Sequence, residues 1–364
     1  MSATEEHNLW LQLRSAGLVE GNPPVLGVTT APWYVRVMLG VAGWIGALFL
    51  LLFVGVGLTF VVKSAGASFV LGLVASAAAG LLFRVQADND FFAQFGLAVS
   101  LAGQGLVLWA LGSWLPREQG QIALAMALFQ SVLFCLLPNF VHRVWVAWTG
   151  AVAVVLALAH WHLQAYGPGL LSAACAGVWL NEFRYAKHGG ILRAGGYGLT
   201  LALMAAVALV TWMAGGGGNW LWHPGRTWPP GSKYHLWIGA GMGGAALLWT
   251  VRRLLMREAV QPASTEGWAM LGAAGVVALA SLKAIGLAPA TLMLLLGYGN
   301  GNRLLAGLGV TALLGYLSFY YYSLQATLLY KSVLISATGL ALLAARFMLS
   351  QWRPISPSEE GRHA

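Results

Sequence analysis

The sequence predicts an all-α fold, a polytopic bundle of transmembrane helices. Of its 364 residues, 59% are hydrophobic and only 9% are charged. A soluble domain carries about 25% charged residues, so this chain has too little charge to cover a soluble surface. In addition, apolar runs of the roughly 20 residues needed to cross a bilayer recur along the chain. These continuous runs differ from the short alternating segments of a membrane β-barrel.

The first expected element is a short helix over residues 4–18, capped by Thr4 and ended by the prolines at 23 and 24. It suits an interfacial position, with a partner-docking helix as the alternative. About twelve spanning segments follow, and the ninth and tenth divide near Gly286. The expected segments are approximately 36–62, 66–86, 91–114, 119–138, 142–163, 166–183, 192–214, 235–256, 266–284, 286–298, 303–323 and 327–350.

Basic residues predict the orientation of the chain. With both termini in the cytoplasm, about fourteen Arg and Lys residues fall on the cytoplasmic side and six on the other side, as the positive-inside rule requires. The expected organisation is a cytoplasmic or interfacial segment over 1–31, a transmembrane domain over 32–352 and a cytoplasmic tail over 353–364.

Charge and cysteine content exclude several classes of function. The formal net charge is +9, but no block of Lys and Arg typical of nucleic-acid binding occurs, and we expect basic loops that face anionic lipid. Cys135 and Cys175 lie inside apolar runs, so neither a disulfide framework nor a metal site is expected. Glu5 and Glu6 stand where a signal peptide would be basic, so we expect no cleavable signal.

Related motifs open the third, seventh and eleventh segments, which lie four segments apart. They are GLAVS at 96–100, GYGLT at 196–200 and GLGVT at 307–311, and a polar cluster precedes each. We interpret them as a threefold repeat of four-helix units, a kind of symmetry common in transporters. Chance similarity among abundant Gly, Leu and Ala is the alternative.

The first candidate site is a cytoplasmic polar cluster. Ionisable residues at the edge of spanning segments are costly and suggest function. Glu182 could pair with Arg84, Arg184 or Arg303 to gate a cavity or relay protons, whereas caps and interfacial salt bridges are the structural alternative. The candidate residues are Arg84, Asp88, Asp90, Asn181, Glu182, Arg184, Asn300, Asn302 and Arg303.

The second candidate site lies toward the opposite side of the membrane. Tyr316 and Tyr320 are four residues apart and therefore share one helix face, and Lys331 begins the last segment. Together with Gln325 they could line a pocket for an anionic or carbonyl-bearing ligand. An aromatic belt with a snorkelling lysine is the alternative. Gln104, deep in the third segment, is a further candidate for substrate contact.

The sequence offers no catalytic residues that we can assign. His160 and His162 are two residues apart and would point in nearly opposite directions on a helix, so they do not form a metal pair. No zinc-protease motif, phosphate-binding loop or serine–histidine–acid set occurs. We therefore expect no cofactor or metal, and an enzyme is the least favoured class of function.

Several motifs carry a resemblance to a known family. They are GNRLL at 301–305, YYYSLQ at 320–325 and TLLYKS at 327–332, together with LWL at 9–11 and PWY at 32–34. The chain resembles, over nearly its whole length, a bacterial membrane-protein family known as domain of unknown function family 4401. The resemblance implies location in the bacterial inner membrane and no assigned activity. It also implies that other uncharacterised membrane proteins are often encoded nearby, which suggests a complex.

Three functions remain as hypotheses. The first is a transporter or permease-like protein for a small solute, which a polar cavity reaching mid-membrane would favour. The second is a non-catalytic subunit of a bacterial membrane complex, which a solid apolar core with an exposed apolar face would favour. The third is an intramembrane enzyme. The expected partners are membrane lipid and other membrane proteins, with no nucleic acid.

Overall fold

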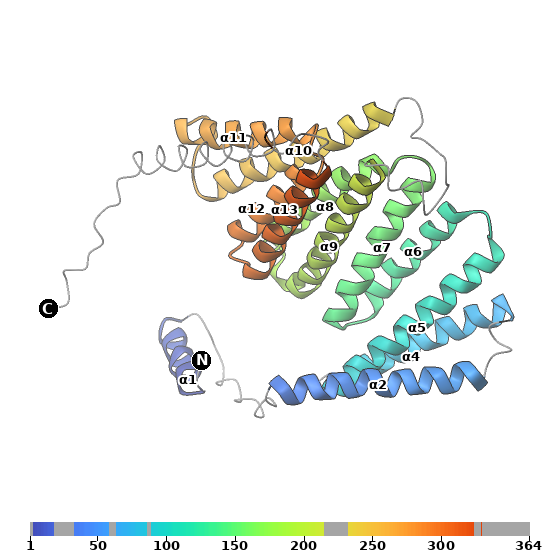
Figure 1. Ribbon diagram of the computed structural model, residues 1–364. Helices are drawn as coiled ribbons and strands as arrows, with labels where there is room; N and C mark the ends of the chain where they lie inside the picture. Colours follow the sequence, from blue (N-terminus) through green and yellow to red (C-terminus); the bar gives the residue numbers. More distant parts are fainter. Residues whose placement is uncertain are drawn as a thin grey trace. The chain divides into compact units, whose positions relative to one another are not determined.

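A computed structural model describes residues 3–17, 33–57, 63–85, 89–214, 232–323 and 329 (Figure 1). Most of these residues are helical, and none of them is in a strand. The chain forms two compact units, which we describe separately: unit 1 comprises Met1–Pro116 and Leu136–Asn139, and unit 2 comprises Arg117–Cys135 and Phe140–Ala364. The short helix expected near the N-terminus is present as α1, Ala3–Ser15.

Unit 1 contains α2 (Trp33–Gly57), α4 (Ala65–Val85) and α5 (Asp90–Trp114). Helices α4 and α5 pack closely because small residues let their backbones approach. A Cβ atom on Gly72 would lie 2.7 Å from the carbonyl oxygen of Gly103, and one on Gly103 would lie 2.6 Å from that of Gly72. Helix α2 is tied to α5 by a 3.0 Å hydrogen bond from Nε1 of Trp44 to Oε1 of Gln94.

Unit 2 holds the longer run of helices. These are α6 (Gln119–Leu136), α7 (Phe140–His160), η1 (Gln164–Tyr166), α8 (Gly167–Leu180), η2 (Ala186–His188), α9 (Gly189–Ala214), α10 (Ser232–Arg257), α11 (Thr265–Ser281), α12 (Leu287–Gly299) and α13 (Arg303–Ser323). Although α6 ends at Leu136, it is described with unit 2 because nearly all of it belongs there.

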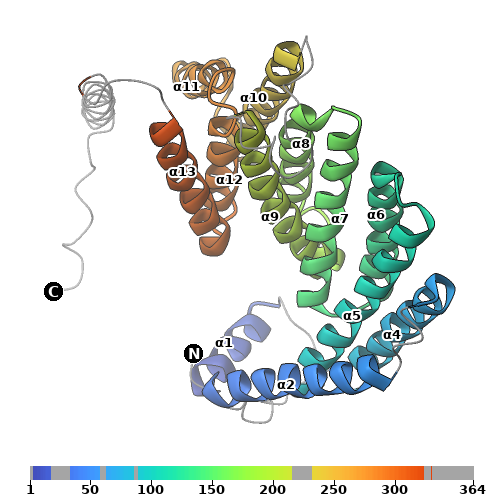
Figure 2. The same cartoon turned by 45° about the vertical axis from the view of Figure 1, so that its right-hand side comes forward.

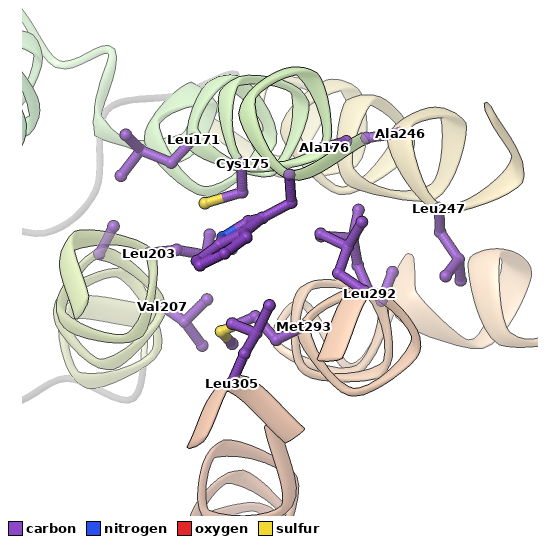
Figure 3. Close-up of a cluster of buried hydrophobic side chains, with 14 of the residues drawn as sticks. Leu171, Cys175, Ala176, Leu203, Val207, Ala246, Leu247, Leu292, Met293 and Leu305 are labelled. Carbon is purple, nitrogen blue, oxygen red and sulfur yellow. The ribbon is translucent and has the colours of Figure 1, made fainter. Parts of the chain in front are cut away.

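Buried side chains of seven helices, α7 to α13, form the core of unit 2 (Figure 2). Figure 3 shows Cys175 of α8, Leu203 of α9, Leu292 of α12 and Leu305 of α13 gathered in one cluster, with Leu171 of α8 at its edge, and all are buried. Trp179, one of the largest of these side chains, is fully buried in the same cluster. Burying such side chains contributes roughly 1.5–3 kcal/mol each in water; inside a bilayer, close van der Waals packing replaces most of that term.

The helices follow the predicted segments. Eleven of the twelve expected segments coincide with α2 and α4 to α13 within a few residues, and the twelfth, 327–350, lies outside the described residues. The expected division near Gly286 is confirmed, because α11 ends at Ser281 and α12 begins at Leu287. Among the described helices, six are long and apolar enough to cross a membrane, namely α4, α5, α6, α7, α9 and α13. The total of about twelve spans and the orientation stay predictions.

Two helices of unit 2 are notably short. Helix α8 has 14 residues and α12 has 13, so at about 1.5 Å per residue each is roughly 20 Å long, against about 30 Å for the hydrocarbon core. Each has a proline in its first turn, Pro168 or Pro289. Both pack against α10, since a Cβ atom on Gly243 would lie 3.8 Å from Pro289 and 4.0 Å from Oγ of Ser172.

Two of the three motifs of the proposed repeat have similar local packing. A Cβ atom on Gly96 would meet the ring of Phe83 at 2.9 Å, and one on Gly196 would meet the ring of Trp179 at 2.7 Å. The hydroxyl residue four positions later is fully buried in both motifs. By contrast, no described atom lies within 4 Å of a Cβ atom on Gly307. The threefold repeat therefore stays a prediction.

Candidate functional site

The polar groups of unit 2 gather at the end where α8 is followed by α9 and α12 by α13, which we call the hairpin end. The turn between α12 and α13 is only three residues long. The N–H of Gly301 donates to the carbonyl of Tyr298 and the N–H of Asn302 to that of Gly297, at 3.0 and 2.8 Å. This is a Schellman motif, and it requires the left-handed conformation that Gly301 adopts, with φ of 63°. Residues 297–301 therefore end α12.

Asn300 joins the end of α12 to the end of α8. Its Nδ2 donates to the carbonyl oxygen of Trp179 at 2.8 Å. Its Oδ1 accepts from Nη1 of Arg257 at 2.8 Å. The Nη2 of Arg257 donates in turn to the carbonyl oxygen of Leu180 at 3.3 Å. The last carbonyl groups of a helix lack intrahelical donors, and here side chains from two other segments satisfy two of them.

Asn302 joins the start of α13 to α9. Its Oδ1 accepts from the N–H of Leu305 at 3.1 Å, so Asn302 is the N-cap of α13. The Tyr197 hydroxyl donates to Oδ1 of Asn302 at 3.0 Å, and Nδ2 of Asn302 donates to the same hydroxyl at 2.8 Å. The ring of Tyr197 contacts that of Trp179 edge-on, with centroids 5.1 Å apart. The indole N–H of Trp179 donates to Oγ1 of Thr200 at 3.2 Å.

These contacts form one connected set, which we call the hairpin-end network. Its members are Trp179, Tyr197, Thr200, Arg257, Asn300 and Asn302. It links α8, α9, α10, α12 and α13 through amide, phenol, indole and guanidinium groups. Because these groups bond to one another and to helix ends, the network is suited to fixing the helices in register.

A separate ion pair lies beside this network. Glu182, only 5% exposed, accepts from Nε of Arg193, whose side chain is 56% exposed. Our expectation that Glu182 pairs with Arg84, Arg184 or Arg303 is therefore corrected. The partner lies in the first turns of α9, which follows η2 in the chain.

The remaining polar-cluster candidates of unit 2 have local roles. The Nδ2 of Asn181 donates to the carbonyl oxygen of Gly177 at 2.7 Å, which caps the end of α8. The guanidinium of Arg184 lies over the ring of Tyr185 at 6.0 Å. Arg303 is exposed at the first position of α13. The structure thus brings Asn181, Glu182, Asn300 and Asn302 to the same end of unit 2.

The residues of the cytoplasmic polar cluster that belong to unit 1 make contacts within that unit. The Nη2 of Arg84 donates to the carbonyl oxygen of Leu136 at 3.2 Å. Asp90 is the first residue of α5, whose N-cap is Asn89. Asp88 lies outside the described residues.

The candidates for substrate contact are divided between the two units. Gln104, 5% exposed in unit 1, donates from Nε2 to Oγ of Ser100 on its own helix at 3.2 Å. In unit 2, the shared face of Tyr316 and Tyr320 is confirmed, because their rings stack with centroids 6.2 Å apart. The Tyr316 ring fills the space beside Gly286. Gln325 and Lys331 lie outside the described residues.

Sequence reasoning missed Trp179, Tyr197, Arg193 and Arg257. Tyr197 stands inside the GYGLT motif, where only its glycines and threonine drew notice. A sequence signal for the network was available at Asn300 and Asn302, since paired asparagines beside a glycine favour a capped turn. Among the described residues, no group of three or more His, Cys, Asp or Glu side chains could hold a metal ion.

The helices and the buried core together define a multi-pass helical membrane protein. A family model described as Domain of unknown function (DUF4401) matches residues 32–352, which is most of the chain. The protein belongs to this family, as the motifs near its two ends indicated. Neither a curated protein nor a solved structure matches the chain.

Proposed function

We propose that the protein is a non-catalytic subunit of a complex in the bacterial inner membrane. The observation that carries this proposal is the packing of unit 2. The space between α8, α9, α10, α12 and α13 is filled by apolar side chains such as Trp179, Leu247 and Leu296, all fully buried. Such close packing suits a rigid membrane scaffold.

Two further observations support this proposal. The polar groups of the hairpin end are engaged with helix termini, which fixes the relative positions of five helices. Large apolar side chains cover the outside of unit 2, for example Leu128 of α6 and Leu304 and Leu314 of α13, each more than half exposed. In a membrane these surfaces face lipid or the helices of a partner protein. The family resemblance also implies that other membrane proteins are often encoded beside this one.

The test is the composition of the particle that the protein forms in its native lipid. The tagged chain is extracted with its surrounding bilayer in polymer-bounded discs, and its complexes are weighed by native mass spectrometry. We expect a second membrane protein at a fixed ratio to the 38.6 kDa chain. A charged substitution at Leu128 and one at Leu314 alter different faces of unit 2. Only the substitution on the face that contacts the second protein should release that protein. A particle that holds this chain alone refutes the proposal.

Transport of a small solute is the second candidate, and one observation favours it. Helices α8 and α12 are too short to cross the membrane fully, and irregular backbone precedes each of them. Non-helical backbone at membrane depth is tolerated where it is buried in protein or lines a cavity, and short segments in corresponding positions mark transporter sites. In η1, Gln164 is 3% exposed and its Oε1 accepts no hydrogen bond from the described residues.

The transport candidate has its own test. The purified chain is reconstituted into liposomes and flux of labelled small solutes is compared with that of empty liposomes. We expect flux that falls when Gln164→Leu removes the amide, while the same substitution at the exposed Gln121 leaves it unchanged. Flux equal to that of empty liposomes for every solute tested eliminates this candidate.

A further inference from the structure

The hairpin end of unit 2 carries an excess of exposed positive charge. Helices α8, α10 and α12 end there, and α9, α11 and α13 begin there, so their terminal dipoles largely offset one another. The exposed basic residues at this end are Arg184, Lys187, Arg193, Arg252, Arg253, Arg257 and Arg303. The acidic residues are Glu182, Glu258 and Glu266. Basic side chains therefore outnumber acidic ones by more than two to one.

Folding accounts for only some of these charges. Arg193 is paired with Glu182, and Arg257 caps α8 and binds Asn300. Among the described residues, no acidic group forms an ion pair with Arg253 or Arg303, nor with Arg252. Arg253 also lies four residues before Arg257 on α10, a spacing at which like charges destabilise a helix. An external anion would remove that repulsion.

Aromatic side chains are interleaved with these arginines. The guanidinium of Arg253 lies over the ring of Trp249 at 5.8 Å, and that of Arg257 lies over the ring of Phe183 at 5.5 Å. Tyr298, at the last turn of α12, is 84% exposed. Exposed aromatic rings are typical of the headgroup region of a bilayer, and guanidinium groups bind phosphate oxygens in pairs.

We propose that the hairpin end binds an anionic phospholipid, with Arg252, Arg253 and Arg303 holding its headgroup phosphate. The contact of Gly299 with Leu254 brings the end of α12 against the last turns of α10, which places Arg303 at the same end as Arg253. The exposed rings then lie along the boundary between headgroup and acyl chains. This combination of phosphate donors with an apolar rim fits a lipid better than free phosphate.

The test compares two double variants with equal change of charge. Arg253→Gln with Arg303→Gln removes two charges from the hairpin end, and Arg117→Gln with Lys283→Gln removes two exposed charges from the opposite end of unit 2. Phosphatidylglycerol is titrated into phosphatidylcholine–detergent micelles that contain the full chain, and bound lipid is counted by native mass spectrometry. Since each basic residue near an anionic surface contributes about fivefold in affinity, we expect the first variant to bind roughly 25-fold more weakly. The second variant should bind as the unaltered chain does.

A second measurement needs no variant. The unaltered chain should bind phosphatidylglycerol more tightly than phosphatidylcholine, and this preference should shrink as salt rises. The proposal is overturned if the two lipids bind equally. It is also overturned if both double variants lose affinity to the same extent, or if inorganic phosphate in lipid-free detergent displaces the lipid at millimolar concentration.

Discussion

Asn302 should act both as a helix cap and as a tie between α13 and α9. In the structure its Oδ1 accepts from the N–H of Leu305, and its amide meets the Tyr197 hydroxyl at 2.8 and 3.0 Å. Loss of a cap costs about 1 kcal/mol. A side-chain hydrogen bond between membrane helices contributes about 0.6 kcal/mol on average. Asn302→Ala should therefore lower the free energy of unfolding by about 2 kcal/mol, and Tyr197→Phe by about 1 kcal/mol.

The two substitutions should not be additive. Because they remove the same two hydrogen bonds, the double variant should lose about 2 kcal/mol rather than about 3 kcal/mol. Asn302→Asp should keep most of the cap, since Asp is as good an N-cap as Asn. The assay is unfolding in lipid–detergent micelles with a rising fraction of dodecyl sulfate, followed by circular dichroism. Additive losses, or a loss below about 0.5 kcal/mol for Asn302→Ala, would refute the reasoning.

Three further predictions use the same unfolding assay. Gly196→Ala should destabilise the protein by about 1–3 kcal/mol, because its Cβ atom would meet the buried tryptophan ring at 2.7 Å. Gly190→Ala, on the same helix with no described atom within 4 Å, should instead be neutral or stabilising by up to about 1 kcal/mol, and equal losses would contradict this account. Gly72→Ala should cost about 1–3 kcal/mol by separating α4 from α5, whereas Gly105→Ala, which faces open space, should not. Gln164→Leu should keep or raise stability by about 1 kcal/mol, since its buried Oε1 accepts no hydrogen bond from the described residues; a clear loss would reveal a bond that the amide makes elsewhere.

The sequence predicted the positions of the helices well because the requirement for an apolar run is local. A bilayer demands about 20 apolar residues whatever the neighbouring helices are, so the segments could be read one at a time. The division near Gly286 was readable for the same reason, since a glycine between two apolar runs favours a break. The two compact units were not predicted, because they depend on which helices pack together.

The partners of the polar residues were harder to predict. Sequence reasoning placed Asn300, Asn302 and Glu182 in one cluster, because all three border spanning segments. It assigned Glu182 the wrong arginine, because the path of the chain from α8 to α9, which decides that Arg193 comes within reach, leaves no local pattern in the sequence. Tyr197 was missed because a single tyrosine in an apolar helix carries no sign of a partner more than a hundred residues away.

The cap on α8 has a consequence for how the protein is made. The carbonyl oxygens of Trp179 and Leu180 receive hydrogen bonds from Asn300 and Arg257, which are synthesised 121 and 77 residues later. The carbonyl oxygen of Leu180 lacks this donor until α10 is complete, and that of Trp179 lacks its donor until α12 is complete. A nascent chain stopped before residue 300 would therefore hold α8 without its final partner. The cap on α8 is therefore completed only when the turn between α12 and α13 has been synthesised.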